Sequence, residues 1–319
     1  MKKIDLYSKH WLRRILPISA TIEISTLCNL RCIGCYRASH DYPHKNKNLS
    51  FDKFKFYFDQ LPFRVNSLTL HGLGEPMLNP DIFEIVDYVS HKSPCDIRFT
   101  TNFIAKEYED YIKVFKKGLG FLTISVDSLD QKEVDRLRNG TDVEELKRRI
   151  GLITKTKYNK RINFWITVSK MNMDSFVRTT EQLLELGARK VFYQIYLDYG
   201  IRDFCLSDDE KKRLIETSQE LKDKYGDRVG QYAPWFKKTT NPCHRITSPV
   251  ISIDGRILPC CLLLGTKINP IGNINDKPFK ELYFSKTVTN MYRNILNGKY
   301  FKFCGAFAST GQCDGKHVT

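Results

Sequence analysis

Three cysteines stand close together near the start of the chain, in the stretch Cys28-Asn-Leu-Arg-Cys32-Ile-Gly-Cys35. Clustered thiols in a reducing compartment indicate metal ligands before disulfides. Three thiolates on one short loop can bind three irons of a cubane iron–sulfur cluster, which leaves the fourth iron open to a chelating molecule. The alternative is a structural zinc site, whose fourth ligand His40 or His44 could supply.

The elements that must position this loop form a repeating pattern of apolar, β-rich runs and amphipathic helices. Ser50 and Asp174 are expected to cap two of the helices, and Gly187 to end the second of these. The predicted strands are Thr21–Ser25, Ser67–His71, Asp96–Thr101, Phe121–Val126, Asn163–Val168 and Val191–Tyr196. The predicted helices are Ser50–Gln60, Pro80–Ser90, Lys106–Lys116, Val143–Thr156, Ser175–Leu186 and Ser207–Lys224.

Six strand–helix units predict a parallel sheet with right-handed crossovers. Because a full barrel takes eight units, we expect an α/β fold, a partial (β/α)6 TIM-like barrel, with its site at the C-terminal ends of the strands. From Gln231 onward Pro, Cys, Gly and Asn become frequent, and Val250–Ser252 and Arg256–Pro259 flank the hairpin turn signal Asp254-Gly255. We therefore expect a barrel domain of residues 1–230 and a small cysteine-rich domain of residues 231–319.

The cysteine loop after the first strand resembles that of the radical S-adenosylmethionine (radical SAM) superfamily, whose hallmark is CX3CX2C. After the second strand, Gly72-Leu73-Gly74-Glu75-Pro76 is similar to the family's Gly-Gly-Glu-Pro motif, which lies beside the methionine amino group of the cofactor. The resemblance implies that Gly72 and Gly74 let the backbone approach closely and that Glu75 accepts a hydrogen bond from the ammonium. Leu73 replaces one of the usual glycines.

Polar residues at the ends of the third and fourth strands, Asn102, Ser125 and Asp127, resemble the family's contacts to the ribose and the carboxylate of the cofactor. Such residues are also common in turns. The family often has an aromatic residue just before the third cysteine. Here Gly34 takes that position and Tyr36 follows the cysteine, so that the loop would contact the adenine through Tyr36 or through its backbone.

The spacing CX11GX4C from Cys243 through Gly255 to Cys260 resembles the opening of the SPASM/twitch domains appended to many members of this superfamily. Those domains carry one or two auxiliary clusters, and full SPASM domains contain a dense run of further cysteines. Because few cysteines follow here, we infer one auxiliary [4Fe–4S] cluster, with a structural zinc as the alternative. The four ligands that we expect are Cys243, Cys260, Cys304 and Cys313.

Cys261 directly follows one of these expected ligands. In anaerobic sulfatase-maturing relatives this position can hold a carboxylate that acts as a base. A thiol is a good hydrogen-atom donor, so Cys261 is a candidate catalytic residue. The two alternatives are a cluster ligand and a small buried apolar residue.

The resemblance implies an enzyme that cleaves S-adenosylmethionine with one electron from a [4Fe–4S] cluster and takes a hydrogen atom from its substrate with the 5′-deoxyadenosyl radical so formed. We expect net oxidation of the substrate, with the auxiliary cluster as electron acceptor. Redox-neutral epimerisation, with Cys261 returning a hydrogen atom, is the second hypothesis. The third, from another class, is a zinc-containing basic nucleic-acid-binding protein.

The chain carries a net charge of +15, and its lysines are spread along the sequence without a dense basic tract. This pattern favours a solvated Lys-rich surface over a nucleic-acid partner. No apolar run is long enough to span a membrane. The start of the chain is basic, but the segment Trp11–Pro17 is too short and too charged for the core of a signal peptide, which predicts a cytoplasmic protein. The expected partners are a one-electron reductant, such as flavodoxin or ferredoxin, and a small-molecule or peptide substrate. Since few residues precede the first predicted strand, we expect no leader-peptide domain and favour a small alcohol, sugar or cyclitol over a peptide, which a separate recognition partner would have to present.

Overall fold

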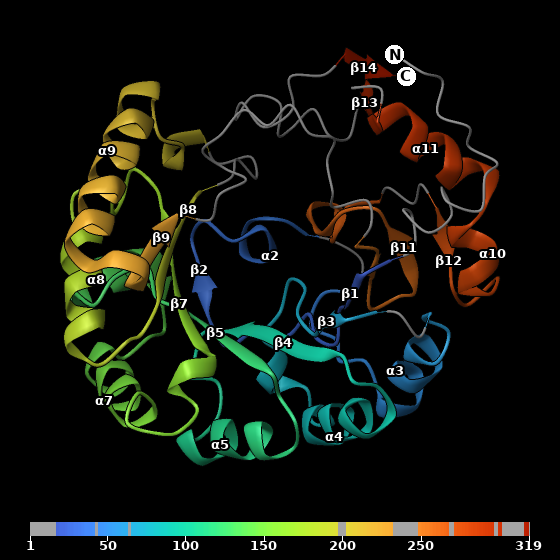
Figure 1. Ribbon diagram of the computed structural model, residues 1–319, viewed down its shortest axis with the longest axis horizontal. Coiled ribbons are helices and arrows are strands. Elements are labelled where there is room, and N and C mark those ends of the chain that lie inside the picture. Colours follow the sequence, from blue (N-terminus) through green and yellow to red (C-terminus); the bar gives the residue numbers. More distant parts are fainter. Residues whose placement is uncertain are drawn as a thin grey trace.

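The structure is a computed structural model in which residues 17–41, 44–62, 65–196, 202–231, 248–267, 271–296, 299–301 and 316–318 can be described. One curved sheet forms its frame (Figure 1), with the strand order β12-β11-β10-β1-β3-β4-β5-β7-β8-β9. All neighbouring strands from β10 to β9 are parallel. The strands of the central part are β1 (Ser19–Ile22), β3 (Ser67–Thr69), β4 (Asp96–Thr101), β5 (Phe121–Ser125), β7 (Ile162–Val168) and β8 (Val191–Ile195).

Helices follow these strands and cover the outer side of the sheet, as in a partial TIM-like barrel (Figure 1). They are α3 (Phe51–Phe58), α4 (Ile82–Lys92), α5 (Tyr108–Lys116), α7 (Val143–Ile153), α8 (Phe176–Glu185) and α9 (Asp208–Tyr225). The Ser50 side chain caps α3 by accepting from the Lys53 N–H, and Gly187 has a φ of +93°, a conformation that ends α8 at little cost. The predicted cap Asp174 is wrong, because Ser175 is the residue that precedes α8 and its side chain makes no capping bond.

The core lies between the sheet and the helices. Along β7 every second residue is buried, beginning with Ile162, while Asn163, Trp165 and Thr167 are half-buried on the other face. Phe164 and Ile166 of β7 belong to one continuous apolar cluster with residues of the surrounding helices. The face that carries Asn163, Trp165 and Thr167 is therefore the inner face of the partial barrel.

The region after Gly230 joins the same sheet. β9 (Val229–Gln231) pairs with β8, and β10 (Val250–Ile251) pairs with β1 on the opposite side of the barrel. β10 and β11 (Arg256–Leu258) form the predicted hairpin, in which Gly255 has a φ of +88°. The remaining elements of this region are β12 (Gly272–Asn273), α10 (Phe279–Tyr283), α11 (Lys286–Leu296), β13 (Lys299–Phe301) and β14 (Lys316–Val318).

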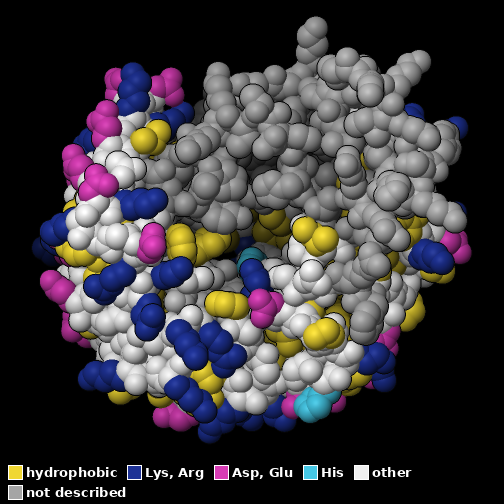
Figure 2. All heavy atoms as spheres, viewed as in Figure 1, with side chains coloured by type: hydrophobic (Ala, Val, Ile, Leu, Met, Phe, Trp, Pro, Cys, Tyr) yellow, Lys and Arg dark blue, Asp and Glu magenta, His cyan; other side chains and the backbone are white. Residues whose placement is uncertain are grey.

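Lys and Arg side chains are spread over the face seen in Figure 2, with Asp and Glu side chains among them. Along the described helices several Lys side chains pair with carboxylates of the same helix, for example Lys147 with Glu144 and Lys211 with Asp208. This mixed surface is the one that the dispersed lysines of the sequence predict.

None of the helices in the described ranges has the length and low charge that crossing a membrane requires.

Candidate iron–sulfur and cofactor site

The three cysteines of the first cluster lie on the loop that follows β1, and all three are half-buried. Burial is the main reason that the pKa of Cys32 rises to about 11, and the nearby thiols of Cys35 and Cys28 add to the rise. Burial also raises the pKa of Cys28. Since burial opposes ionisation of the Cys28 and Cys32 thiols, a bound cation favours their thiolate forms, and together with Cys35 this donor set fits an iron–sulfur cluster.

The surroundings of the loop argue against zinc. In the described part of the chain no three His, Cys, Asp or Glu side chains are close enough to ligate a single metal ion. The thiolates of a cubane cluster bind different irons and can be more widely spaced than the ligands of one zinc ion. His40 stacks on the Tyr36 ring with centroids 4.2 Å apart, and His44 pairs with Asp254 at 3.4 Å, so both candidate fourth ligands have other contacts.

A buried arginine that the sequence analysis did not single out holds the cysteine loop. Arg138 lies in β6 (Arg138–Asn139), which pairs with β2 (Arg31–Cys32), so that Arg138 stands opposite Cys32. Its guanidinium donates to the Ser125 side chain at 2.9 Å and pairs with Asp127 at 3.5 Å. Asp127 also accepts from the Thr167 N–H at 2.9 Å. Two of the predicted cofactor-binding residues, Ser125 and Asp127, are therefore the residues that orient Arg138.

Both glycines of the Gly72–Pro76 motif are needed because another segment of this chain passes very close to them. A Cβ atom on Gly72 would lie 2.3 Å from the Glu23 carboxylate, and one on Gly74 would lie 2.5 Å from the carbonyl oxygens of Ser25 and Leu27. The Gly74 and Glu75 N–H groups donate to those two carbonyls at 3.2 and 2.6 Å. Two backbone hydrogen bonds thus connect the motif to the segment that leads into the cysteine loop.

Glu75 is buried within this motif. Its carboxylate accepts from the Met77 N–H at 3.1 Å, from the Thr101 hydroxyl at 2.8 Å and from the Asn102 N–H at 2.8 Å. Because a carboxylate can accept about four hydrogen bonds, the donors within the described part of the chain leave one acceptor position. Burial raises the pKa of Glu75 to about 7, and these three donors together with the Arg138 charge oppose the rise.

Asn102 connects the end of β4 to the cysteine loop. Its amide donates to the Asn29 side chain at 2.8 Å and points at the Cys28 sulfur from 3.9 Å. The Leu30 N–H points at the same sulfur from 3.5 Å. Such N–H···S contacts tune the potential of an iron–sulfur cluster.

Part of the C-terminal region packs beside this site. Cys260 precedes a short 3₁₀ helix, Cys261–Leu263, and Cys261 packs with Leu73 against a small apolar cluster of Val250, Leu258, Leu263 and Leu264. A Cβ atom on Gly265 would lie 2.5 Å from the Tyr36 ring, so this segment also touches the cysteine loop. The other expected auxiliary ligands, Cys243, Cys304 and Cys313, lie outside the described residues.

Comparisons with known proteins agree with this arrangement. A family model described as "Radical SAM superfamily" matches residues 22–183, and one described as "Iron-sulfur cluster-binding domain" (SPASM) matches residues 243–314. The subtilosin biosynthesis protein AlbA of Bacillus subtilis is 27% identical over 288 residues, which cover 87% of this chain and 62% of AlbA. An AdoMet-dependent heme synthase of Methanosarcina barkeri is 25% identical over 330 residues, which cover 91% of this chain and 92% of the synthase.

Among solved structures, Streptococcus suis SuiB bound to the precursor peptide SuiA has the same fold, with a TM-score of 0.71 and 16% identity over 87% of this chain and 67% of SuiB. The radical SAM model covers more than half of the sequence, and its domain implies a [4Fe–4S] cluster and S-adenosylmethionine. The SPASM match implies further iron–sulfur binding. The chain belongs to the radical SAM superfamily and carries a SPASM region after its partial barrel.

Proposed function

We propose that this chain cleaves S-adenosylmethionine at a cluster held by Cys28, Cys32 and Cys35 and oxidises its substrate after removing a hydrogen atom from it. The arrangement of charge around the thiols carries the proposal. Glu75 accepts from the Asn102 N–H, and the Asn102 amide points at the Cys28 sulfur from 3.9 Å, while Arg138 stands opposite Cys32. A molecule with a free ammonium and a free carboxylate, such as the methionine part of the cofactor, fits between an anion and a guanidinium.

When bound, the cluster and S-adenosylmethionine supply the radical chemistry, and an auxiliary cluster on Cys243, Cys260, Cys304 and Cys313 would accept the second electron of an oxidation. Glu75 holds the ammonium with its remaining acceptor position. Arg138 holds the carboxylate, and Ser125 and Asp127 keep Arg138 oriented. Asn102 stabilises the Cys28 thiolate, while Gly72 and Gly74 allow the loop to pass close to its neighbours.

Epimerisation is the second candidate function, because Cys261 and Leu73 of the cofactor-binding loop pack against the same small apolar cluster. From that place a thiol could return a hydrogen atom to a substrate radical, which leaves the oxidation level of the substrate unchanged. The thiyl radical so formed would take one electron from the reductant and one proton to restore the thiol. In the oxidation the substrate radical instead loses an electron and a proton.

For the substrate we propose a peptide, with a small alcohol or sugar as the second class. AlbA is described as a bacteriocin biosynthesis protein and SuiB as bound to a precursor peptide, whereas the heme synthase is named for a small-molecule product. The chain spans 62% of the length of AlbA, so AlbA supports the class of substrate and no particular peptide. A flavodoxin or ferredoxin in the cytoplasm would supply the electron.

The test is cofactor cleavage by the anaerobically reconstituted protein. With dithionite as reductant the wild-type protein should convert S-adenosylmethionine into 5′-deoxyadenosine and methionine. The triple variant C28A/C32A/C35A should form neither product while it keeps the remaining iron, and Cys205→Ala should behave as the wild type does. Continued cleavage by the triple variant would show that the assignment is wrong.

A further inference from the structure

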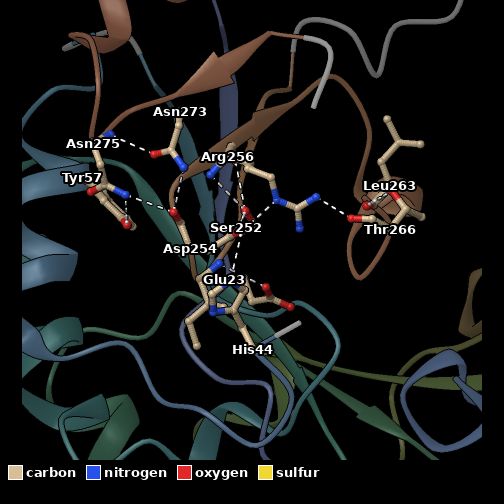
Figure 3. A network of polar contacts seen from close by, with 11 residues as sticks. Glu23, His44, Tyr57, Ser252, Asp254, Arg256, Leu263, Thr266, Asn273 and Asn275 are labelled. Carbon is tan, nitrogen blue, oxygen red and sulfur yellow. Dashed lines mark hydrogen bonds and ion pairs between the residues drawn. The ribbon is translucent and has the colours of Figure 1, made fainter. Parts of the chain in front are cut away.

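The Glu23 carboxylate joins two loops that are far apart in the sequence. Glu23 directly follows β1 and is 2% exposed. One of its oxygens accepts from the Leu73 N–H at 2.9 Å, and the other accepts from the Ile253 N–H at 3.1 Å. Leu73 belongs to the cofactor-binding motif, and Ile253 lies in the turn between β10 and β11. Figure 3 shows Glu23 beside the hairpin residues Ser252 and Asp254. A single buried side chain therefore connects the two functional regions.

The motif is shaped around this carboxylate. Since a Cβ atom on Gly72 would lie 2.3 Å from a Glu23 oxygen, only glycine fits at position 72 while Glu23 is in place. The Leu73 side chain packs against the C-terminal apolar cluster of Val250, Leu258, Leu263 and Leu264, as Cys261 does. The backbone and a side chain of the motif thus both touch the C-terminal region.

The hairpin is itself held firmly (Figure 3). Asp254 pairs with Arg256 at 2.9 Å and with His44 at 3.4 Å, and the Arg256 guanidinium donates to the Thr266 carbonyl. Asn273 and Asn275 both donate to the Asp254 carbonyl at 3.0 Å. Because these contacts make the hairpin rigid, a movement of Ile253 would also move the segment that contains Cys260 and Cys261.

We propose that Glu23 is a positioning residue that couples the cofactor-binding loop to the SPASM-region hairpin, so that each stabilises the other. This inference rests on the proposed function, since it takes the Gly72–Pro76 loop to bind S-adenosylmethionine. Without the carboxylate, two buried N–H groups lose their acceptors. Coupling between two sites is reciprocal, so the bound cofactor should slow hydrogen exchange in the hairpin as well as in its own loop.

Hydrogen exchange of the reconstituted protein tests the coupling, with and without S-adenosylmethionine. In the wild-type protein the cofactor should slow exchange both in residues 70–76 and in residues 250–258. In Glu23→Gln, which keeps the size of the side chain but offers one acceptor oxygen in place of two, protection should be confined to residues 70–76. The KM for S-adenosylmethionine should rise about tenfold in this variant, with a smaller change in kcat.

Two further variants separate coupling from a general loss of stability. Asp254→Ala loosens the hairpin without touching Glu23 and should also reduce the protection of residues 250–258 by the cofactor. Glu216→Gln, on the surface helix α9, should leave the exchange pattern and the KM unchanged. If S-adenosylmethionine protects residues 250–258 equally in the wild type and in Glu23→Gln, the coupling is absent. If it binds to the wild type but protects only its own loop, the coupling is absent and the proposed function stands. If it does not bind at all, the proposed function fails and the coupling fails with it.

Discussion

The ring of Tyr196 fills the space into which a side chain at position 34 would project, since a Cβ atom on Gly34 would lie 2.8 Å from the Tyr196 ring. Gly34 stands between Cys32 and Cys35, at the position where related loops often have an aromatic residue. The aromatic ring beside the loop is thus supplied by the residue that follows β8. Tyr196 is 6% exposed and also packs on Phe204, with ring centroids 5.7 Å apart.

Gly34→Ala should therefore displace the ring and distort the loop between two cluster ligands. We expect the KM for S-adenosylmethionine to rise about tenfold, equivalent to about 1.4 kcal/mol, with the iron content unchanged. The double variant Gly34→Ala/Tyr196→Leu should bind the cofactor better than the sum of the single effects implies, because the smaller side chain makes room. Additive effects in this cycle would mean that the ring does not govern the loop.

The number of irons distinguishes between one and two auxiliary clusters. Reconstituted protein should hold about eight irons per chain, from two cubane clusters. The triple variant C28A/C32A/C35A should hold about four, and so should the quadruple variant that replaces Cys243, Cys260, Cys304 and Cys313 with Ala. A wild-type value near four would exclude the auxiliary cluster, and a value near twelve would show that a second one exists.

Cys261 distinguishes oxidation from epimerisation. We expect Cys261→Ala to lower the turnover about tenfold or more while both clusters remain, because Cys261 packs against the same apolar cluster as Leu73 of the cofactor-binding loop. In deuterated water, donation from Cys261 would place one solvent deuterium in the product, whereas oxidation gives an unlabelled product. Loss of auxiliary iron in the variant would identify Cys261 as a ligand. Full activity of the variant would mean that Cys261 only packs against its neighbours.

The pKa of Glu75 predicts a pH dependence of stability. In the folded protein, burial raises this pKa from 4.5 to about 7, so the folded state keeps a proton that the unfolded chain loses. The resulting stabilisation is fully present below about pH 4.5 and is lost as the pH rises through about 7. We expect the Tm of the cofactor-free protein to fall from about pH 5 to about pH 8, and to fall less steeply in Glu75→Gln, which cannot ionise.

Two comparisons complete this measurement. Burial also raises the pKa of Glu23 to about 7, so Glu23→Gln should remove a further part of the slope. Bound S-adenosylmethionine should flatten the wild-type curve, because its ammonium favours the ionised form of Glu75. An equal slope in the wild type and in both variants would contradict the assignment of this pH dependence to the two carboxylates.

The six central strands, their helices and the hairpin at Gly255 were predictable because they depend on local periodicity and turn residues. The cap of α8 was predicted wrongly, at Asp174, since neighbouring Asp and Ser residues are both good caps by type. The pairing of β2 with β6 and of β10 with β1 could not be predicted, because each joins segments with no shared local signal. The roles of Arg138 and Glu23 could not be predicted for the same reason, because only the tertiary fold buries their charges.

The pairing of β10 with β1 has a consequence for how the chain matures. The first strand of the barrel is synthesised well before its outer neighbour, residues 250–251, so β1 has an open edge until those residues have left the ribosome. Open parallel edges recruit other strands, and contacts between distant segments form slowly. Truncation at residue 231 should leave this edge uncovered for good, and the shortened protein should collect in inclusion bodies even though every central strand and helix is present.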